Sequence, residues 1–302
     1  MSRIKKVIKN NFWGRYFISC YHCVMCKIAP ALISDEKAIK LNYRRKCKKD
    51  LNLSNPQTFS EKMNWYKLND KNPLMEKCAD KVAVREYISN KGYEDCLNEV
   101  YGVFNKVQDI DYDSLPDQFV IKAAHGSHMN YIVKNKESFD WNRAKRMMKT
   151  WLHQDIAWSG REWVYKDIPK RIIIEKYLED ETGELRDYKL FCFNGKPTFL
   201  QIDVGRNTEH YRNYYDMNFS FLPMRDDVPS NESAVPNKPE KLQTMINIAT
   251  DLAKPFQFAR IDFYQVCNKV YFGEITFFHN SGITWFQPEE YDGIFGKYWT
   301  IK

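Results

Sequence analysis

Two acidic residues near the C-terminal end, Asp262 and Glu274, have the residue types and spacing of a metal and phosphate site. Apolar and polar residues alternate over 258–266 and again over 270–278, which predicts a hairpin with a short turn between its strands. The two carboxylates are then expected opposite each other, where they suit Mg²⁺, a cation that usually shares its shell with substrate phosphates. Arg260 projects from the same face as Asp262 because side chains alternate along a strand. The pattern indicates phosphoryl chemistry; the alternative is a surface hairpin with a cross-strand ion pair.

Three lysines precede this pair in short, distinct motifs. Lys81 follows an aspartate at a helix start, and Lys189 lies on a strand. Lys122 ends an apolar strand directly before a glycine-containing loop, whose backbone N–H groups and Ser127 hydroxyl could bind phosphate oxygens. The loop lacks the G-x-x-x-x-G-K-[ST] pattern, so a P-loop fold is not implied. The apolar segment 172–178 is either a core strand or a wall that offers a purine stacking and main-chain hydrogen bonds.

The elements around these residues predict an α+β protein with antiparallel sheets. Thr58 or Ser60 is expected to cap a helix that contains residues 63–68. Further helices are expected at 80–90, 140–151 and 241–253, and strands at 119–122, 131–134, 171–178, 187–194 and 197–204. The last two strands flank Asn-Gly, a strong hairpin signal. A polar, proline-bearing loop is expected at 225–239.

Composition bounds the class of protein. The 302 residues are 43% hydrophobic, enough for a large core, and the net charge of +7 is concentrated near the N-terminus. This charge suggests a nearby anionic surface, but no zinc-finger or stacking pattern supports nucleic acid. Eight scattered cysteines favour a reducing cytoplasm.

The run from 12 to 33 is apolar but interrupted by Arg15, His22 and Lys27, so it predicts neither a cleaved signal peptide nor a confident membrane span. Two readings stay open: a basic-aromatic helix on the cytoplasmic face of a membrane, or a helix packed on the body of the protein. The cysteines and histidine at 20–26 have metal-like spacing, but cysteine also serves as a small hydrophobe there.

Several motifs, taken in order, resemble those of the ATP-grasp superfamily and are similar in form to those of D-alanine–D-alanine ligase. They are Asp80-Lys81, V-I-K before H-G-S-H, I-I-E-K-Y-L, and R-I-D…G-E-I-T…S-G. Within this superfamily, three segments resemble the TupA-like branch, which is found among polysaccharide and teichuronopeptide biosynthesis proteins. They are N-P-Q-T-F-S-E-K-M-N-W-Y-K-L-N-D, D-Y-K-L-F-C-F-N-G-K-P and G-E-I-T-F-F. The resemblance covers Asn52 to the C-terminus. It implies an ATP-grasp fold that holds the nucleotide between two antiparallel-sheet lobes.

The resemblance also implies roles for residues at the ATP site. Lys81 and Lys122 would bind the ATP phosphates. The phosphate lid would consist of His125, Gly126, Ser127 and His128, and the adenine hinge of Glu175, Lys176 and Leu178. The ribose acid would be Glu184, with Glu179 and Glu181 as alternatives. Asp262, Glu274 and Thr276 would hold Mg²⁺, with Thr276 standing where the superfamily usually has asparagine.

Further roles concern the reacting groups. Arg260 would face the reacting carboxyl oxygen. Lys189 and Arg206 would bind phosphate or the acceptor's carboxylate, or else are strand-surface charges. The second substrate would be held by His279, Asn280, Ser281 and Gly282, with His279 as a candidate base.

The domains implied are a basic-aromatic N-terminal segment (1–50), an N-terminal lobe (51–118), a central subdomain with the lid (119–178) and a C-terminal subdomain with the metal site (179–302). The reaction implied is ATP-dependent ligation of a carboxylate to a small amine through an acylphosphate, on a cell-surface polysaccharide or a sugar carboxylate. The cofactors would be ATP and Mg²⁺, in the cytoplasm or at the inner membrane face.

Two other functions remain as alternatives. Asp109-Ile110-Asp111 has the D-x-D form of metal-dependent glycosyltransferases, although the residues after it favour a solvated turn. A non-catalytic scaffold of a polysaccharide assembly complex is the other alternative.

Overall fold

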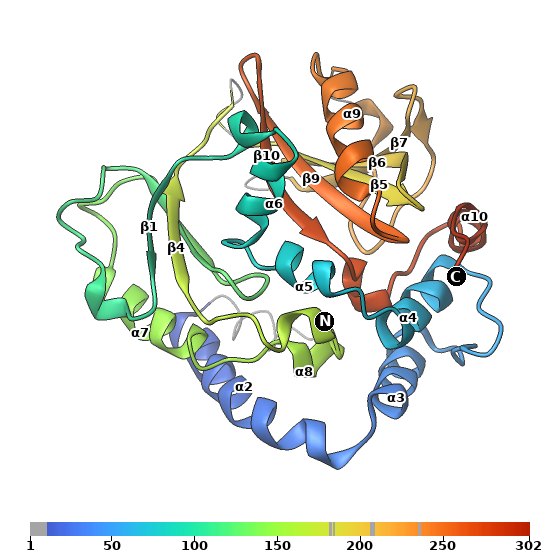
Figure 1. Cartoon of the computed structure of the whole chain (residues 1–302), viewed down its shortest axis with the longest axis horizontal. Coiled ribbons are helices and arrows are strands. Elements are labelled where there is room, and N and C mark those ends of the chain that lie inside the picture. The colour runs from blue at the N-terminus through green and yellow to red at the C-terminus, as the bar shows by residue number, and fades with distance from the viewer. Residues whose placement is uncertain (1–10, 181–182, 184, 206–208, 235–236) are drawn as a thin grey trace. The chain divides into compact units, whose positions relative to one another are not determined.

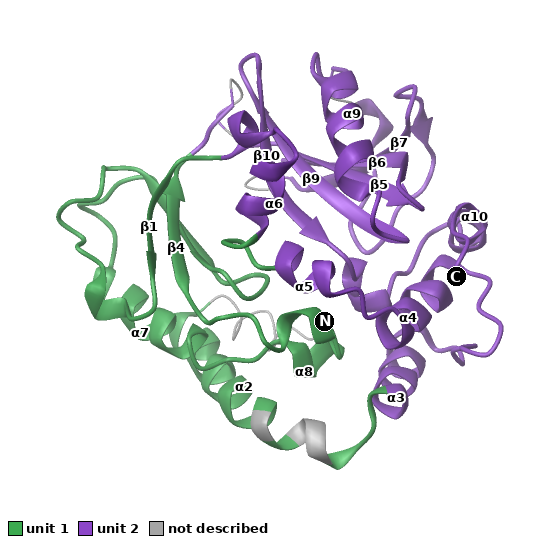
Figure 2. Cartoon of the chain, viewed as in Figure 1, with its two compact units in different colours: residues 1–35, 80–83, 98–177 green, residues 36–79, 84–97, 178–302 purple. Residues whose placement is uncertain are grey.

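The computed structural model describes residues 11–180, 183, 185–205, 209–234 and 237–302. The chain forms two compact units whose segments interleave along the sequence (Figure 2). Unit 1 comprises 1–35, 80–83 and 98–177, and unit 2 comprises 36–79, 84–97 and 178–302. The segment 51–118, predicted as one lobe, is therefore divided between the two units.

Unit 1 contains a four-stranded antiparallel sheet in the order β1-β4-β2-β3 (Figure 1). Its strands are β1 (Val100–Phe104), β2 (Phe119–Ala123), β3 (Asn130–Val133) and β4 (Ile172–Lys176). Its helices are α2 (Phe12–Leu32), α7 (Trp141–Trp151) and α8 (Ala157–Gly160), with 3-10 turns η2 (Val107–Asp109) and η3 (Trp163–Tyr165).

The core of unit 1 lies between this sheet and α7. Asp140 caps α7 by accepting a hydrogen bond from the backbone N–H of Arg143. The helical spacing of its buried residues, which include Met148 and Trp151, presents one apolar side to buried strand residues such as Ile121. The predicted helix at 140–151 is confirmed.

Unit 2 contains a six-stranded antiparallel sheet in the order β10-β9-β5-β6-β7-β8. Its strands are β5 (Asp187–Phe193), β6 (Lys196–Val204), β7 (Tyr211–Asp216), β8 (Phe221–Leu222), β9 (Phe258–Val266) and β10 (Lys269–Thr276). Its helices are α3 (Asp35–Cys47), α4 (Phe59–Asn69), α5 (Pro73–Ala79), α6 (Val84–Asn90), α9 (Leu242–Ala253) and α10 (Glu290–Tyr298), with 3-10 turns η1 (Glu94–Cys96), η4 (Glu232–Ala234) and η5 (His279–Gly282).

One set of alternating side chains in the large sheet is apolar. Leu190 pairs with both Leu200 and Ile261, and all three are fully buried. Helix α9 contacts β5, β6 and β9 and contributes buried residues such as Met245 and Leu252. The other face combines a row of polar residues with buried aromatic side chains, where Phe191 packs against Phe199, Phe258 and Phe59 of α4.

Local signals placed most elements correctly. Thr58 caps α4, and a reciprocal capping box with Glu61 is present. The Asn194-Gly195 turn joins β5 to β6 with positive φ at both residues, as a two-residue hairpin requires. One start was wrong: the helix expected from 80 begins at Val84, because Asp80 forms a turn by accepting a hydrogen bond from the Val82 N–H.

Candidate functional site

The carboxylate pair forms as predicted, by an unexpected route. Asp262 and Glu274 are cross-strand partners on β9 and β10. The turn is shorter than expected, since β10 already begins at Lys269, and a register shift between Phe272 and Glu274 compensates. Gly273 is the extra residue, and a Cβ there would lie 3.0 Å from the Asp262 carbonyl oxygen. The bulge therefore turns Glu274 toward Asp262.

Strand register continues this polar row across the sheet. Lys189 on β5 is the partner of Asp262, and Gln201 on β6 is the partner of Lys189. In the next row, Asp187 pairs with Asp203. These side chains share one face because residues two apart on a strand point the same way. All five are buried.

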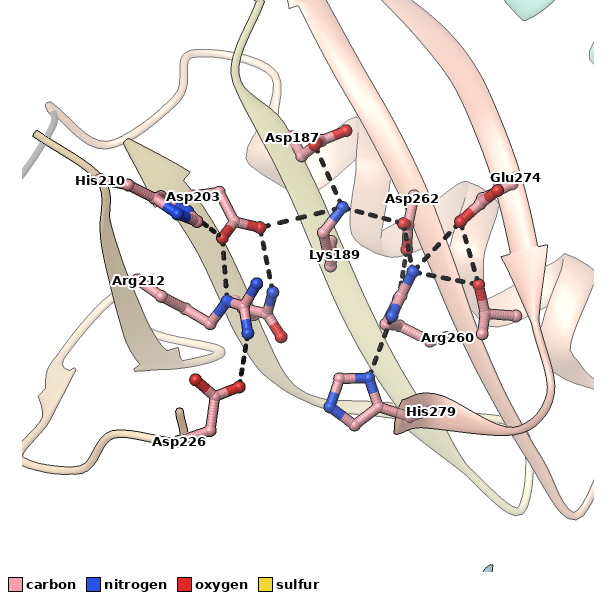
Figure 3. Close-up of polar contacts among 12 residues, drawn as sticks. Asp187, Lys189, Asp203, His210, Arg212, Asp226, Arg260, Asp262, Glu274 and His279 are labelled. Carbon is pink, nitrogen blue, oxygen red and sulfur yellow. Dashed lines mark hydrogen bonds and ion pairs between the residues drawn. The ribbon is translucent and has the colours of Figure 1, made fainter. Parts of the chain in front are cut away.

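Arg260 is the centre of the first cluster (Figure 3). Its Nε and Nη2 donate to the two carboxylate oxygens of Asp262, each at 2.7 Å. The same Nη2 donates to Glu274 Oε1 at 3.3 Å and to Thr276 Oγ1 at 3.0 Å. Burial lowers the pKa of the Arg260 guanidinium, but these acids outweigh burial and the net shift is upward. Arg260 therefore stays charged and holds all three predicted metal ligands in place.

Lys189 joins this cluster to a second set of acids. Its Nζ lies 3.0 Å from Asp262 Oδ2, 3.2 Å from Asp187 Oδ2 and 4.0 Å from Asp203 Oδ2 (Figure 3). Burial raises the pKa of Asp262, and Arg260 and Lys189 oppose that shift. Two fixed cations therefore stabilise the ionised form of Asp262. Positive charge held in place in this way also suits negative charge that develops during a reaction.

The sequence did not reveal a neighbouring cluster built around Arg212. Its Nε donates to Asp203 Oδ1 at 2.8 Å, and its Nη1 donates to Asp226 Oδ2 at 2.6 Å. His210 Nε2 also lies 2.9 Å from Asp203 Oδ1 (Figure 3). Asp203 is therefore shared by Lys189, Arg212 and His210. The only sequence signal was the strand alternation over 197–204, because Asp226 comes from a loop.

The structure corrects the suggestion that His279 is a base. The side chain is buried, and its Nδ1 lies 3.0 Å from Arg260 Nη1. Arginine can only donate, so Nδ1 must accept and the proton resides on Nε2. Burial and the nearby Arg260 lower the pKa of His279 well below its ordinary value. The imidazole is neutral, and its lone pair is occupied by Arg260.

Helix α4 holds the loop predicted to bind the second substrate. Asn64 Nδ2 donates to the Gly282 carbonyl at 2.7 Å. Lys67 Nζ donates to the Ser281 carbonyl at 2.7 Å and to Ser281 Oγ at 3.2 Å. Asn280, Ser281 and Gly282 all have positive φ, which is strained for the first two. The sequence did not identify Asn64 and Lys67 as the supports of this loop.

In unit 1 the predicted phosphate ligands lie on and beside a hairpin. Strands β2 and β3 pair as expected, with the loop 124–129 between them. Lys122 Nζ donates to Glu175 Oε2 on β4 at 2.6 Å. Lys81 Nζ donates to the Gly126 carbonyl in the loop at 2.8 Å. Lys122 therefore lies on the hairpin itself, and Lys81 reaches its loop from a distant part of the sequence.

The loop residues differ in exposure. Ser127 and His128 are exposed, whereas His125 is buried and its Nε2 lies 2.9 Å from the Trp151 carbonyl oxygen. Burial lowers the pKa of His125. Its side chain belongs to the interior of unit 1, so only its backbone remains available for the predicted lid role.

The predicted adenine hinge is partly engaged within the protein. Glu175 pairs with Lys122, the Lys176 N–H donates to the Glu99 carbonyl, and the Lys176 carbonyl accepts from Asn98. Leu178 is buried at the start of the next segment of unit 2. Glu184, the alternative Glu181, and Arg206 lie outside the described residues.

The donor set suits Mg²⁺ of the kind that completes its shell with substrate. Over the described parts of the chain, no group of three or more His, Cys, Asp or Glu residues could hold a metal. Two carboxylates and the Thr276 hydroxyl instead form a partial set of oxygen ligands, and magnesium sites often have one or two carboxylates plus phosphate oxygens. The residues present therefore fit the ion together with a nucleotide.

Two other motifs have structural roles. Asp109 and Asp111 are exposed, and Asp111 Oδ1 accepts from the Asp113 N–H in a turn. This is the solvated turn expected as the alternative to a D-x-D strand end. The cysteines of α2 lie in a helix packed against α7 and α8.

Three solved structures show partial similarity. D-alanine–D-alanine ligase from Bacillus anthracis is 18% identical, with 66% of this chain and 56% of that chain covered and a TM-score of 0.40. The Helicobacter pylori enzyme is 15% identical, with 68% of this chain and 55% of that chain covered and a TM-score of 0.38. The ATP-grasp ligase PsnB complexed with a minimal precursor is 7% identical, with 73% of this chain and 60% of that chain covered and a TM-score of 0.41. The chain thus spans little more than half the length of these two D-alanine–D-alanine ligases.

No curated protein matches the chain. The family described as TupA-like ATPgrasp matches residues 61–300, which include the lysines of unit 1 and the acidic hairpin of unit 2. This match covers most of the chain and agrees with the motifs read from the sequence. The chain belongs to the TupA-like ATP-grasp family.

Proposed function

We propose that this protein is an ATP-dependent ligase that joins a carboxylate to an amine through an acylphosphate. We further propose that it modifies a cell-surface polysaccharide or its precursor. Family membership supports ATP-grasp chemistry. The observation that carries the proposal is the buried cluster in which Arg260 and Lys189 share Asp262 next to Glu274.

In the proposed first step, a carboxylate oxygen of the substrate attacks the γ-phosphorus of ATP and ADP leaves. Asp262 and Glu274 would hold Mg²⁺, which when bound neutralises charge on the phosphates. Lys189 stays within reach of that charge because Asp187 and Asp262 fix its ammonium group. In unit 1, Lys122 would exchange its bond to Glu175 for a phosphate oxygen.

In the proposed second step, the amine nitrogen attacks the acyl carbon, the bond from that carbon to the phosphate oxygen breaks, and the departing phosphate takes the amine proton. Arg260 is rigidly held and charged, so it is suited to stabilise the oxyanion that develops on the former carboxylate. His279 does not take the amine proton, because its lone pair faces Arg260. The loop at 280–282, tied to α4, would contact the second substrate. The eight free cysteines are in keeping with a cytoplasmic reaction.

The test is to incubate the protein with MgATP and a panel of uronic acids and small amines, measuring ADP and phosphate release. We expect release that requires both partners and a covalent product detectable by mass spectrometry. The double variant Asp262→Asn, Glu274→Gln should abolish release, while circular dichroism checks that it is folded.

Asp109→Asn with Asp111→Asn is the matched acid-to-amide control, because these side chains are exposed and lie in a turn. We expect the control to retain the full rate. Release of UDP from a sugar nucleotide without ATP, lost in this control variant, would instead establish a glycosyltransferase.

A further inference from the structure

Helix α2 carries an apolar stripe that faces solvent. Its members recur every three or four residues, so they lie on one side of the helix. Each is between 48% and 68% exposed, and they are Trp13, Phe17, Tyr21, Val24, Ile28 and Leu32. The 21-residue helix is about 30 Å long at 1.5 Å per residue. Large exposed apolar patches on soluble domains usually mark interaction surfaces.

The opposite side of α2 already has its packing partners in unit 1. Ser19 is buried and its Oγ lies 2.6 Å from Thr150 Oγ1 on α7. Cys23 Sγ donates to the Thr150 carbonyl at 3.4 Å, and the Phe12 ring lies 5.5 Å from the Arg143 guanidinium carbon. The helix is thus anchored through one face, and the stripe is not needed to attach it.

The N-terminal sequence that contains the stripe is basic, and its first acidic residues are Asp35 and Glu36, after the end of α2. The first 34 residues contain six basic side chains, Arg3, Lys5, Lys6, Lys9, Arg15 and Lys27, and no aspartate or glutamate. The rest of the chain is close to neutral, since the net charge of +7 less these six leaves +1. Basic residues next to interfacial aromatic side chains match an anionic lipid surface, where each lysine or arginine contributes about 1 kcal/mol.

We propose that α2 binds to the surface of a bilayer that contains anionic lipids, with its apolar stripe in the headgroup region and its other face on unit 1. No helix among the described residues is long and apolar enough to cross a membrane. The geometry is that of an interfacial amphipathic helix, whose apolar face enters the boundary between headgroups and acyl chains. This inference is independent of the ligase chemistry, and it would place the enzyme beside a membrane-linked acceptor.

The test is co-sedimentation of the full-length protein with vesicles of phosphatidylcholine and phosphatidylglycerol in equal amounts, without nucleotide. We expect binding that weakens on vesicles of phosphatidylcholine alone and falls with added salt, because screening shortens the reach of the charges. The variant Phe17→Ala, Val24→Ala keeps helix-forming residues and should reduce partitioning roughly tenfold or more.

The matched control is Ile132→Ala, Trp285→Ala, which removes two exposed apolar side chains (59% and 61% exposed) that are not part of α2. It should bind vesicles like the unaltered protein. Equal binding by the stripe variant and the unaltered protein would overturn the proposal. So would sedimentation velocity showing a lipid-free dimer that the stripe variant dissociates, since a second copy would then cover the stripe.

Discussion

The ion pair of Lys122 in unit 1 and the cluster around Arg260 in unit 2 differ in how they hold their charges. In unit 1, Lys122 has Glu175 as a partner, and their side chains are 25% and 11% exposed. In unit 2, Arg260 contacts three other polar side chains besides Asp262, and the Asp262 side chain is 2% exposed. The first arrangement is a pair at the margin of solvent, and the second is a buried network.

This difference separates two tasks. A partly exposed ion pair contributes little to stability and can exchange its partner for a ligand at low cost. A buried network is expensive to disturb, because removal of one member leaves an uncompensated charge in a low-dielectric interior. Lys122 can therefore exchange Glu175 for a ligand at low cost, whereas the side chains around Asp262 are held in fixed positions. Substitutions that change the free energy of unfolding test this difference.

The largest effect is expected for Arg260→Ala. Asp262 would remain buried without its bidentate partner, so the free energy of unfolding should fall by about 3–5 kcal/mol. Urea unfolding followed by circular dichroism measures the loss. Lys176→Ala is the control, because its pair with Glu99 in unit 1 is exposed and the cost should stay below about 1 kcal/mol. Equal losses in both variants would remove the distinction between the units.

The next effect concerns the loop held by α4. Gly282 has φ +71°, and a Cβ there would lie 2.7 Å from Asn64 Nδ2, so Gly282→Ala should cost about 2–3 kcal/mol. Gly92 has a similar positive φ of +79°, and a Cβ there would have nothing within 4 Å. Gly92→Ala therefore measures backbone strain alone and should cost about 1 kcal/mol. Urea unfolding of both variants gives the difference, and indistinguishable values would mean that α4 does not constrain the loop.

A third effect depends on pH. The pKa of His279 in the folded protein lies well below its ordinary value of 6.5. Between these two pKa values, His279 is protonated in the unfolded chain but not in the folded protein. Stability from this group is present above about pH 6.5 and is lost as the pH falls toward the folded pKa, at about 1.4 kcal/mol per pH unit. The variant His279→Gln keeps an acceptor for Arg260 and should lack this slope. Urea unfolding of both proteins at about pH 7.5 and 5.5 tests this difference. An equal change in the free energy of unfolding between the two pH values in both proteins would contradict a neutral buried imidazole.

The smallest stability effect is expected for Lys122→Met, below about 1 kcal/mol, because its ion pair is partly exposed. ATP affinity should nevertheless fall roughly tenfold or more if this ammonium binds phosphate. Isothermal titration calorimetry measures the affinity, and Lys196→Met, an exposed lysine on β6, is the control. Unchanged ATP affinity in the Lys122 variant would remove unit 1 from the phosphate site.

Much of the fold could be predicted because its signals are local. Capping at Thr58, the Asn194-Gly195 turn and the alternation along β9 depend only on neighbouring residues. The start of α6 was misplaced because Asp80 accepts a hydrogen bond from Val82 and also pairs with Arg171, a partner 91 positions away. Sequence spacing carries no sign of that contact.

The candidate site divides in the same way. The sequence placed Asp262 opposite Glu274 correctly but missed the bulge at Gly273 that produces the pairing. It assigned Lys189 without foreseeing that Asp187 and Asp203 surround it, and it offered no role for Arg212. Each omission involves partners from different strands or loops, which meet only when the register of the sheet is set.

Contiguous sequence was enough to indicate the family, the acidic hairpin, the order of the lysines predicted to bind phosphate, and an apolar, basic-aromatic run near the N-terminus. Three features are visible only in the folded chain. Arg260 donates to the lone pair of His279, Asn64 and Lys67 hold the loop after the hairpin, and the apolar stripe of α2 faces solvent. Burial and hydrogen-bond partners belong to packing, and packing joins residues that the sequence keeps far apart.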